Sequence, residues 1–265
     1  MNRICKTIKW IVGIMFLMSN GIFAQHQELY EAKTFINNAD TLNYRIMYPK
    51  DFSEDKQYPL VLFLHGAGER GSNNALQLVH GSKLFANDQN REAFPAIVIF
   101  PQCPQDDYWA NASVDRTTQP LTLKFPNGGE PTKALSLVIQ LMDDMVAKPF
   151  VAKQQVYVGG LSMGGMGTFE ILYRKPELFA AAFAICGGGN TEAAKAYATT
   201  IDLWVFHGAK DDVVTPQLSM DMVSAILNYG GKPNFTLYAD ANHNSWDPAF
   251  AEPKLLPWLF SKSKQ

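Results

Sequence analysis

One stretch of this chain, GGLSMGGMG at residues 159–167, lies between a short apolar run at 156–158 and a segment that fits a helix. Glycine stands two residues before and two residues after Ser162. A sharp turn from a strand into a helix strains the backbone and brings the two elements close together, so only small residues fit beside it. The layout predicts a nucleophile elbow, with Ser162 as the reacting group and the backbone amide of Met163 as an oxyanion donor. An ordinary glycine-rich turn has the same pattern, so the rest of the chain must decide between the two.

The composition fits one globular domain, with two small domains as the alternative. With 265 residues, of which 47% are hydrophobic and 18% charged, the chain can bury a large core. Strand-like runs alternate with helix-like segments from residue 25 to the end. This alternation predicts a single α/β domain over residues 25–265, with a mostly parallel central sheet of about eight strands flanked by helices.

The strand-like runs include two, at 60–64 and 97–100, that are continuously apolar, which is typical of strands buried on both faces. The first two runs of the chain are expected to form an antiparallel pair. The full set of predicted strands is 33–36, 42–48, 60–64, 97–100, 156–159, 181–185, 203–206 and 235–238.

Three segments fit helices: 132–148, 163–174 and a third that runs from a Thr215 cap to Gly230. The first has apolar residues on one face and is expected to cover the sheet. Residues 106–130 show no periodicity and follow a central strand, so we expect a binding loop or a cover over the site there.

The first 24 residues differ from the rest. Three positive charges precede a short apolar run at 10–18, and small or neutral residues follow as far as Ala24. The pattern predicts a signal peptide at residues 1–24 and an exported protein, periplasmic or secreted, with no stable membrane insertion after cleavage; a retained N-terminal anchor is the alternative. The mature chain would keep 20 of the 23 Lys and Arg residues against 25 Asp and Glu, so its net charge would fall from −2 to −5. Nucleic acid is therefore not an expected partner.

Two cysteines, Cys103 and Cys186, remain after the predicted cleavage. Two are too few for a disulfide scaffold, and we expect both as small buried side chains beside the sheet, although export would permit a bridge between them. The chain has no paired Cys or His spacing of the kind that zinc sites use, so no metal is expected.

A serine hydroxyl is a weak nucleophile at neutral pH, so Ser162 needs a general base and a group that orients this base. Among the five histidines, His65 and His207 each end a buried strand and precede a glycine. A ring at such a position commonly packs or holds the loop, and we expect both to be structural. His243 lies just beyond the last predicted strand, where a loop can bring its ring over the serine. We therefore expect His243 to be the base.

The acid that orients His243 is expected in the loop HGAKDDVVTP at 207–216, which follows a strand at the same edge of the sheet. Asp211 is the first candidate and Asp212 the main alternative, and either could instead be a turn or helix-capping carboxylate. Asp240 is also close to His243 in sequence, but its expected role is to end the last strand. The serine, the acid and the histidine follow one another in that order along the chain, and the residues between each pair are enough for one strand and one helix.

Four motifs carry a family resemblance: HGAGERG at 65–71, GLSMGG at 160–165, HGAKDDVV at 207–214 and NHNSW at 242–246. Their identity and order resemble the secreted carboxylesterase and feruloyl-esterase-like branch of the α/β-hydrolase superfamily. Related branches are the phospholipase/carboxylesterase and prolyl-oligopeptidase-like proteins. The resemblance covers about residues 42–260.

The resemblance implies a Ser-His-Asp triad of Ser162, His243 and Asp211, with the amide of Ala67 as a second oxyanion donor beside that of Met163. It implies a two-step acyl transfer through an acyl-enzyme, without a metal or an organic cofactor. Serine stands where dienelactone hydrolases carry cysteine, which disfavours that chemistry. The chain also has no room for the propeller domain of prolyl oligopeptidases.

The sequence indicates the substrate less directly than the catalytic residues. Trp109 and Trp246 could each stack on a sugar or an aromatic acyl group, with core packing as the alternative. Glu69 and Arg70 could bind an acidic substrate or form a local ion pair. We expect a small-molecule or glycan-linked ester with a short-chain or aromatic acyl group, such as acetyl or feruloyl. The alternatives are a small exported serine peptidase and a catalytically silent glycan-binding relative, and the oligomeric state is left open.

Overall fold

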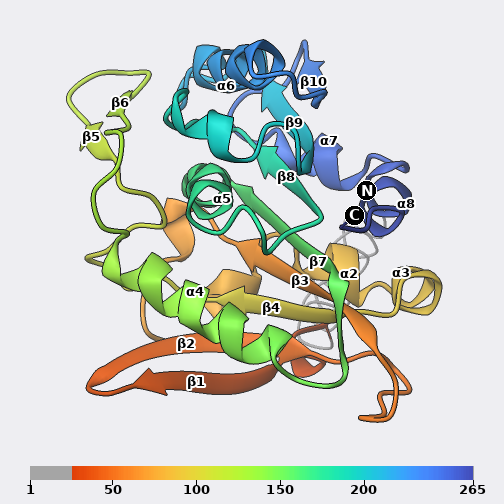
Figure 1. Ribbon diagram of the computed structural model, residues 1–265. Helices are drawn as coiled ribbons and strands as arrows, with labels where there is room; N and C mark the ends of the chain where they lie inside the picture. The colour runs from red at the N-terminus through yellow and green to blue at the C-terminus, as the bar shows by residue number, and fades with distance from the viewer. Residues whose placement is uncertain (1–25, 265) are drawn as a thin grey trace, which may run out of the picture.

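The computed structural model describes residues 26–264, and its main feature is an eight-stranded sheet with the order β1-β2-β4-β3-β7-β8-β9-β10 (Figure 1). The β1–β2 and β2–β4 pairs are antiparallel, and the other neighbouring pairs are parallel. The predicted mostly parallel sheet is confirmed: seven of the eight predicted runs fall within one of its strands, and the run 42–48 extends one residue beyond the end of its strand. These strands are β1 (Glu31–Asn37), β2 (Asp40–Met47), β3 (Tyr58–Leu64), β4 (Ile97–Pro101), β7 (Val151–Leu161), β8 (Ala181–Ile185), β9 (Asp202–Gly208) and β10 (Asn234–Tyr238).

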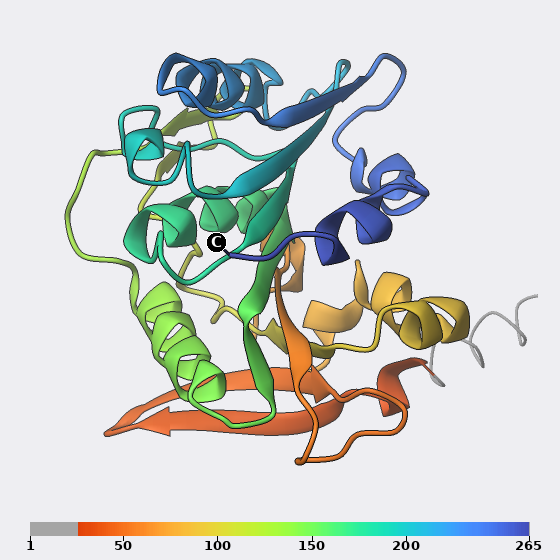
Figure 2. The same ribbon diagram turned by 45° about the vertical axis from the view of Figure 1, so that its right-hand side comes forward.

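Helices cover both faces of the sheet (Figure 2). In β3, Leu60, Leu62 and Leu64 belong to one hydrophobic cluster, whereas Val61 and Phe63 belong to another, because alternate residues of a strand point to opposite faces. Residues from three helices complete the first cluster, and residues from three of the four shorter helices complete the second. The helices are α4 (Lys133–Val146), α5 (Met163–Arg174) and α6 (Gln217–Asn228) on the first face, and α2 (Ser82–Ala86), α3 (Asp88–Ala93), α7 (Trp246–Phe250) and α8 (Leu255–Phe260) on the second.

Two of the helices show how the local sequence sets an element's beginning. The Thr132 hydroxyl accepts a hydrogen bond from the Leu135 amide at the start of α4, which confirms the helix predicted there. The start predicted for α6 is wrong by one residue. Pro216 occupies the N-cap position and α6 begins at Gln217, so Thr215 does not cap it. Proline fits this position because the first helical amides have no partner inside the helix.

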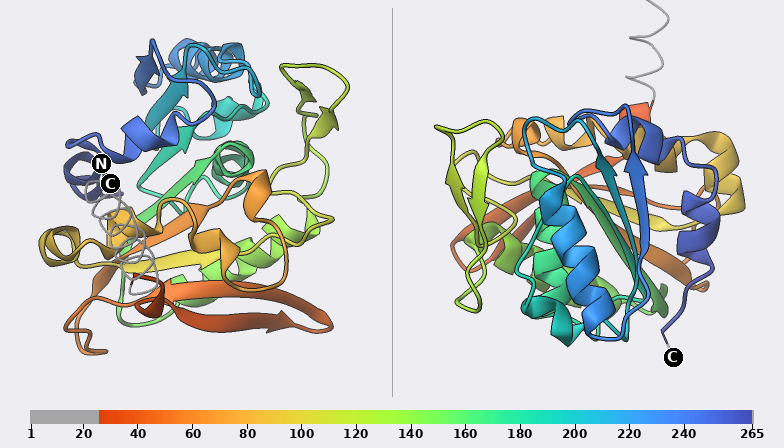
Figure 3. Two further views of the ribbon diagram at one scale, coloured as in Figure 1. Left: turned by 180° about the vertical axis from the view of Figure 1, so that it is seen from behind. Right: turned by 90° about the horizontal axis from the view of Figure 1, so that it is seen from above.

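Residues 106–130, for which the sequence predicts a loop or cover, contain a two-stranded hairpin that is separate from the main sheet. Its strands are β5 (Ser113–Asp115) and β6 (Thr122–Lys124). Figures 1 and 3 show the hairpin standing clear of the main sheet, on the side of α5 and α6. Three residues are too few to give a strand a readable alternation, which explains why the sequence does not predict it.

The parallel strands bring the motif-bearing loops to one edge of the sheet. The loops after β3, β7, β9 and β10 all leave at carboxyl ends of strands that run in the same direction. In open sheets of this kind, ligands bind at that edge. The four sequence motifs therefore meet there.

Three further sequence expectations concern the chain's ends and cysteines. The predicted signal peptide, residues 1–24, lies outside the described residues. Within residues 26–264, no helix is long and apolar enough to cross a membrane. Cys103 and Cys186 are buried, as expected, and both are free thiols.

Candidate active site

Ser162 lies at the turn between β7 and α5 with a positive φ of 53° and a ψ of −117°. This strained conformation is rare for a residue with a side chain. The two glycines that flank it are required by packing. A Cβ on Gly160 would overlap the backbone of Gly164, and a Cβ on Gly164 would overlap the Leu64 carbonyl group at the end of β3. The predicted elbow geometry is therefore present.

The histidine and the acid reach Ser162 from two other loops. His243 Nε2 lies 3.0 Å from Ser162 Oγ, and His243 Nδ1 lies 2.8 Å from Asp211 Oδ2. The Asp211 side chain is fully buried, whereas 20% of the His243 side chain is exposed. The structure thus brings together the three residues predicted as a triad, in hydrogen-bonding geometry suited to proton transfer from the serine.

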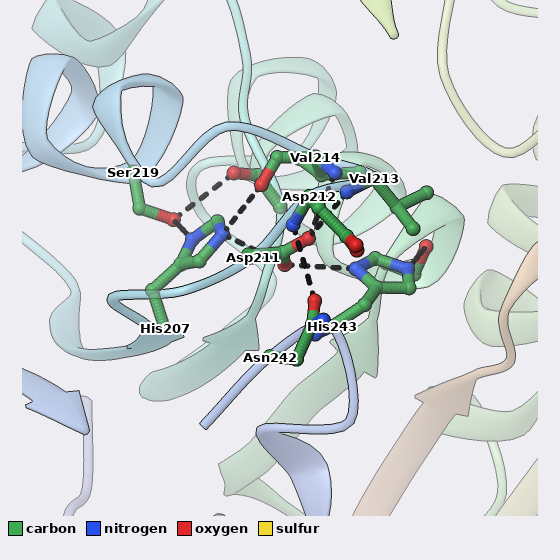
Figure 4. Close-up of polar contacts among 10 residues, drawn as sticks. His207, Asp211, Asp212, Val213, Val214, Ser219, Asn242 and His243 are labelled. Atoms are coloured by element: carbon green, nitrogen blue, oxygen red, sulfur yellow. Dashed lines mark hydrogen bonds and ion pairs between the residues drawn. The ribbon is translucent and has the colours of Figure 1, made fainter. Parts of the chain in front are cut away.

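The Asp211 carboxylate has partners on both of its oxygens (Figure 4). Oδ1 accepts from the amides of Val213 (3.0 Å) and Val214 (2.9 Å), while Oδ2 faces His243 and His207. Burial raises the pKa of this carboxyl group. The hydrogen bonds from His207 and His243, the charge of His243 and the hydrogen bond from the Val214 amide all lower it, and together they outweigh burial. The pKa of Asp211 is therefore held well below its usual range, and the group is a carboxylate at neutral pH.

His207 lies on the other side of this carboxylate from His243 (Figure 4). Its Nε2 lies 3.1 Å from Asp211 Oδ2 and 3.0 Å from the Val214 carbonyl oxygen. Because both of these groups only accept, Nε2 must carry a hydrogen. Its Nδ1 lies 2.7 Å from the hydroxyl of Ser219, which donates to a backbone carbonyl oxygen of residue 187. His207 is structural, as expected, but sequence reasoning missed that it holds the acid; the four-residue spacing to Asp211 was the available signal.

The alternative acids do not contact the histidine. Asp212 is exposed, and its backbone amide donates to Asn242 Oδ1 (3.1 Å), which also accepts from the His243 amide. Asp240 forms an exposed ion pair with Lys210 (2.7 Å). Asn242 thus ties the loop of the acid to the loop of the histidine.

The two predicted oxyanion donors lie beside the serine. Met163 is the first residue of α5, and the first amides of a helix have no partner within the helix. Ala67 begins a short 3-10 helix, Ala67–Glu69, and lines the same cavity as Ser162. Both positions fit the stabilisation of a negatively charged oxygen.

A cavity of about 250 Å³ contains Ser162 and His243. One group of lining residues consists of Glu69, His80 and Trp246. A carboxylate oxygen of Glu69 lies 3.8 Å from His80 Nε2, and the ring centroids of His80 and Trp246 are 5.1 Å apart. The other group lies toward the β5–β6 hairpin and consists of Tyr108, Arg116, Leu121, Met166, Val213 and Val214. The cavity therefore has a polar, aromatic wall and a mostly apolar wall.

The two predicted substrate tryptophans have different environments. Trp109 is completely buried, and its indole N–H donates to the His65 carbonyl oxygen (3.1 Å). It packs edge-on against the His65 ring, so the expectation that Trp109 stacks on substrate is wrong and the core-packing alternative holds. Trp246 lines the cavity and packs edge-on against His243, with 5.5 Å between ring centroids. Its role toward substrate stays a prediction.

His65 supports the loop that carries Ala67. Its Nε2 accepts from the Cys103 amide (3.0 Å), and its Nδ1 lies 2.6 Å from the Gly66 carbonyl oxygen. Burial lowers the pKa of His65 to about 4, so the ring is neutral at neutral pH and Nδ1 is the donor. The structural role expected for His65 agrees with these contacts.

One group of potential metal ligands, Cys186, Asp211 and His243, has its ligand atoms within 4.8 Å of one another in the described part of the chain. The Asp211 carboxylate and His243 already contact each other. Burial raises the pKa of the Cys186 thiol, which disfavours the thiolate that binds metals. The arrangement fits a hydrogen-bonded triad better than a metal centre.

Comparisons with known proteins identify the family of this chain. A sequence profile of a family described as phospholipase/carboxylesterase matches residues 51–253. The crystal structure of a thermostable esterase is 34% identical, with a TM-score of 0.80, over 91% of this chain and 64% of that one. A bifunctional acetylxylan esterase/xylanase of Neocallimastix patriciarum is 32% identical over 101 residues, which are 35% of this chain and 15% of that protein. This chain therefore spans less than two thirds of either relative.

A solved structure of a ferulic acid esterase is more distant. It is 18% identical, with a TM-score of 0.66, and the match covers 88% of this chain and 98% of that one. At this identity the likeness shows a shared fold, the α/β-hydrolase fold that the motifs predict.

Proposed function

The chain belongs to the phospholipase/carboxylesterase family, and we propose that it is an exported serine carboxylesterase that acts on short-chain or aromatic esters of carbohydrates. The observation that carries this proposal is the line of contacts from Ser162 through His243 to Asp211, which opens into a cavity of about 250 Å³. Export rests on the signal peptide predicted at residues 1–24.

The first half of the reaction forms an acyl-enzyme. His243 Nε2 takes the proton of Ser162 Oγ, 3.0 Å away, as the oxygen attacks the ester carbonyl carbon. The amides of Met163 and Ala67 donate to the oxyanion of the tetrahedral intermediate, and one such donor contributes about 100- to 1000-fold in kcat. The alcohol then leaves with the proton that His243 returns.

The second half releases the acid. His243 takes a proton from water, which attacks the acyl carbonyl carbon, and Ser162 recovers its proton when the ester bond to the enzyme breaks. Asp211, 2.8 Å from His243 Nδ1, keeps the ring in the tautomer whose Nε2 can accept a proton. As a carboxylate, it also stabilises the positive ring that forms in each half.

The size and lining of the cavity support small acyl groups. About 250 Å³ lies below the range of about 300–1000 Å³ that is usual for drug-sized ligands. This volume suits an acetyl or single aromatic acyl group better than a long lipid chain. Trp246 offers an aromatic ring beside His243 on which a sugar or aromatic group could stack. The similarities to an acetylxylan esterase/xylanase and a ferulic acid esterase point the same way.

The test compares the mature protein with Ser162→Ala on 4-nitrophenyl acetate, 4-nitrophenyl butyrate and methyl ferulate. We expect turnover of these esters by the wild type and loss of at least about 1000-fold in kcat in the variant. An inactive wild type on every ester would overturn the esterase proposal. Comparable turnover of an amide and its matched ester would instead favour a small exported peptidase, and glycan affinity without turnover would favour a silent glycan-binding protein.

A further inference from the structure

The β5–β6 hairpin is fixed to the loop that carries Asp211. The Leu121 amide, just before β6, donates to the Val213 carbonyl oxygen (2.9 Å). Just after β6, the Asn190 side chain donates to the Phe125 carbonyl oxygen (2.9 Å). The hairpin's own strands are largely exposed, and it stands clear of the main sheet (Figure 3). Leu123 of β6 packs against the small cluster of Ala110, Met166 and Val214, and most of the other side chains of the two strands are exposed, where they can contact a substrate.

Arg116 directly follows β5 and lines the cavity that contains Ser162. Tyr108 lines the same wall of the cavity, and burial raises the pKa of its hydroxyl while the charge of Arg116 acts in the opposite direction. The neighbouring carboxylate of Asp115 is engaged elsewhere, because it accepts from the Thr117 amide (2.9 Å) and hydroxyl (2.6 Å). Within the described part of the chain, no carboxylate forms an ion pair with Arg116.

The other charged side chains of this loop region are arranged differently. Arg70 donates to the backbone carbonyl oxygens of Ala67 (3.1 Å) and Asp107 (3.2 Å), so its guanidinium links its own loop to the loop after β4. It does not form the ion pair with Glu69 that the sequence allows. Glu69 lies 3.8 Å from His80 instead, in the wall that includes the start of α7. A negative group on a substrate would be repelled at that wall and attracted at Arg116.

We propose that Arg116 is a specificity-determining residue that selects esters carrying a carboxylate close to the ester bond, in either the acyl or the alcohol part. A guanidinium binds a carboxylate through two parallel hydrogen bonds, which gives direction as well as charge complementarity. The inference rests on the proposed function, because the bound molecule must be an ester that Ser162 attacks. Arg116 is exposed, so salt screens the attraction and the effect is moderate.

The test measures kcat/KM for two matched pairs of esters. Monomethyl succinate and methyl 4-methylpentanoate differ by a carboxylate against an isopropyl group in the acyl part. The pair 4-acetoxybenzoate and 4-nitrophenyl acetate differ by a carboxylate against a nitro group in the alcohol part. In Arg116→Gln, we expect the charged-to-neutral ratio of kcat/KM to fall about 5-fold in one pair. Lys124→Gln, which removes the same charge from β6 outside the cavity lining, should keep the wild-type ratio.

The outcomes are distinct. A fall confined to the succinate pair assigns the carboxylate to the acyl part, and a fall confined to the benzoate pair assigns it to the alcohol part. The wild-type preference should also weaken as sodium chloride is added. Unchanged ratios for Arg116→Gln in both pairs, or equal changes in Lys124→Gln, overturn the proposal. Failure of the esterase proposal would appear separately, as equal rates for wild type and Ser162→Ala on the neutral esters.

Discussion

The elbow around Ser162 and the β5–β6 hairpin border the same cavity, but they are built in opposite ways. On the elbow side, residues 156–161 and 163–169 are buried, and the glycines leave no space for one more methyl group. The hairpin consists of two three-residue strands that are largely exposed. The difference teaches that the predicted reacting groups lie on the packed core, whereas the wall proposed to select substrate belongs to a largely exposed hairpin that contacts the core through few side chains. Substitutions in the first region should therefore change kcat or stability, and those in the second should change KM.

The largest effect is expected from the acid in the packed region. Asp211→Asn should lower kcat about ten-thousand-fold, because an amide in place of the carboxylate no longer holds His243 in the reactive tautomer. Asp212→Asn is the matched control, since this neighbouring side chain is exposed and does not contact His243. Steady-state hydrolysis of 4-nitrophenyl acetate, with circular dichroism to verify folding, measures both. Similar losses in the two variants would remove the distinction between the buried acid and its neighbour.

The next effect concerns stability at the elbow. In Gly164→Ala, the added Cβ would overlap the carbonyl groups of Leu64 and His65, so the free energy of unfolding should fall by about 3 kcal/mol. Gly68→Ala serves as the control because a Cβ there has no neighbour within 4 Å. Urea unfolding of both variants measures the difference. If the two variants unfold at the same urea concentration, β3 and α5 are not packed as closely as described.

A smaller effect should appear as a pH dependence of stability. The pKa of the buried Asp211 is depressed in the folded state, so its contribution to stability is full above the ordinary Asp value of about 4 and decreases as pH falls below it. The difference in unfolding free energy between wild type and Asp211→Asn should therefore be constant from pH 6 to about 5 and shrink below about 4. A difference that stays constant down to pH 2 would show that the carboxylate is not stabilised by its histidine and amide partners.

The same two regions differ in how much their sequence predicts. At the elbow, the spacing of Gly160, Ser162 and Gly164 reflects a close backbone approach that few other residues permit, so the sequence predicts the geometry directly. The expectation for Trp109 failed because its burial depends on Gly167 and His65, which pack against it from distant parts of the chain. Periodicity along the sequence carries no information on such contacts.

The hairpin is a second element that the sequence predicts only in part. Its strands are too short for a readable alternation, and its position depends on contacts with distant residues, such as the hydrogen bond from the Leu121 amide to the carbonyl oxygen of Val213, 92 residues further along. The sequence predicts a cover near the site from the lack of periodicity at 106–130. It does not predict that Arg116 lines the cavity. That placement depends on how two distant loops meet.

The smallest effect tests whether the hairpin matters for substrate binding alone. Leu121→Pro removes the amide that donates to the Val213 carbonyl oxygen, while Leu121→Ala keeps this amide and shortens the side chain that lines the cavity. A hydrogen bond of this kind contributes about 1 kcal/mol, so the proline variant should raise KM about 5-fold on 4-nitrophenyl butyrate, with kcat within about twofold of wild type. Both variants should unfold at nearly the wild-type urea concentration, because the strands of the hairpin are largely exposed. Leu121→Pro could instead lose more kcat or more stability than Leu121→Ala. That result would mean that the hairpin supports the Asp211 loop itself. The separation between a catalytic core and a substrate-selecting hairpin would then be wrong.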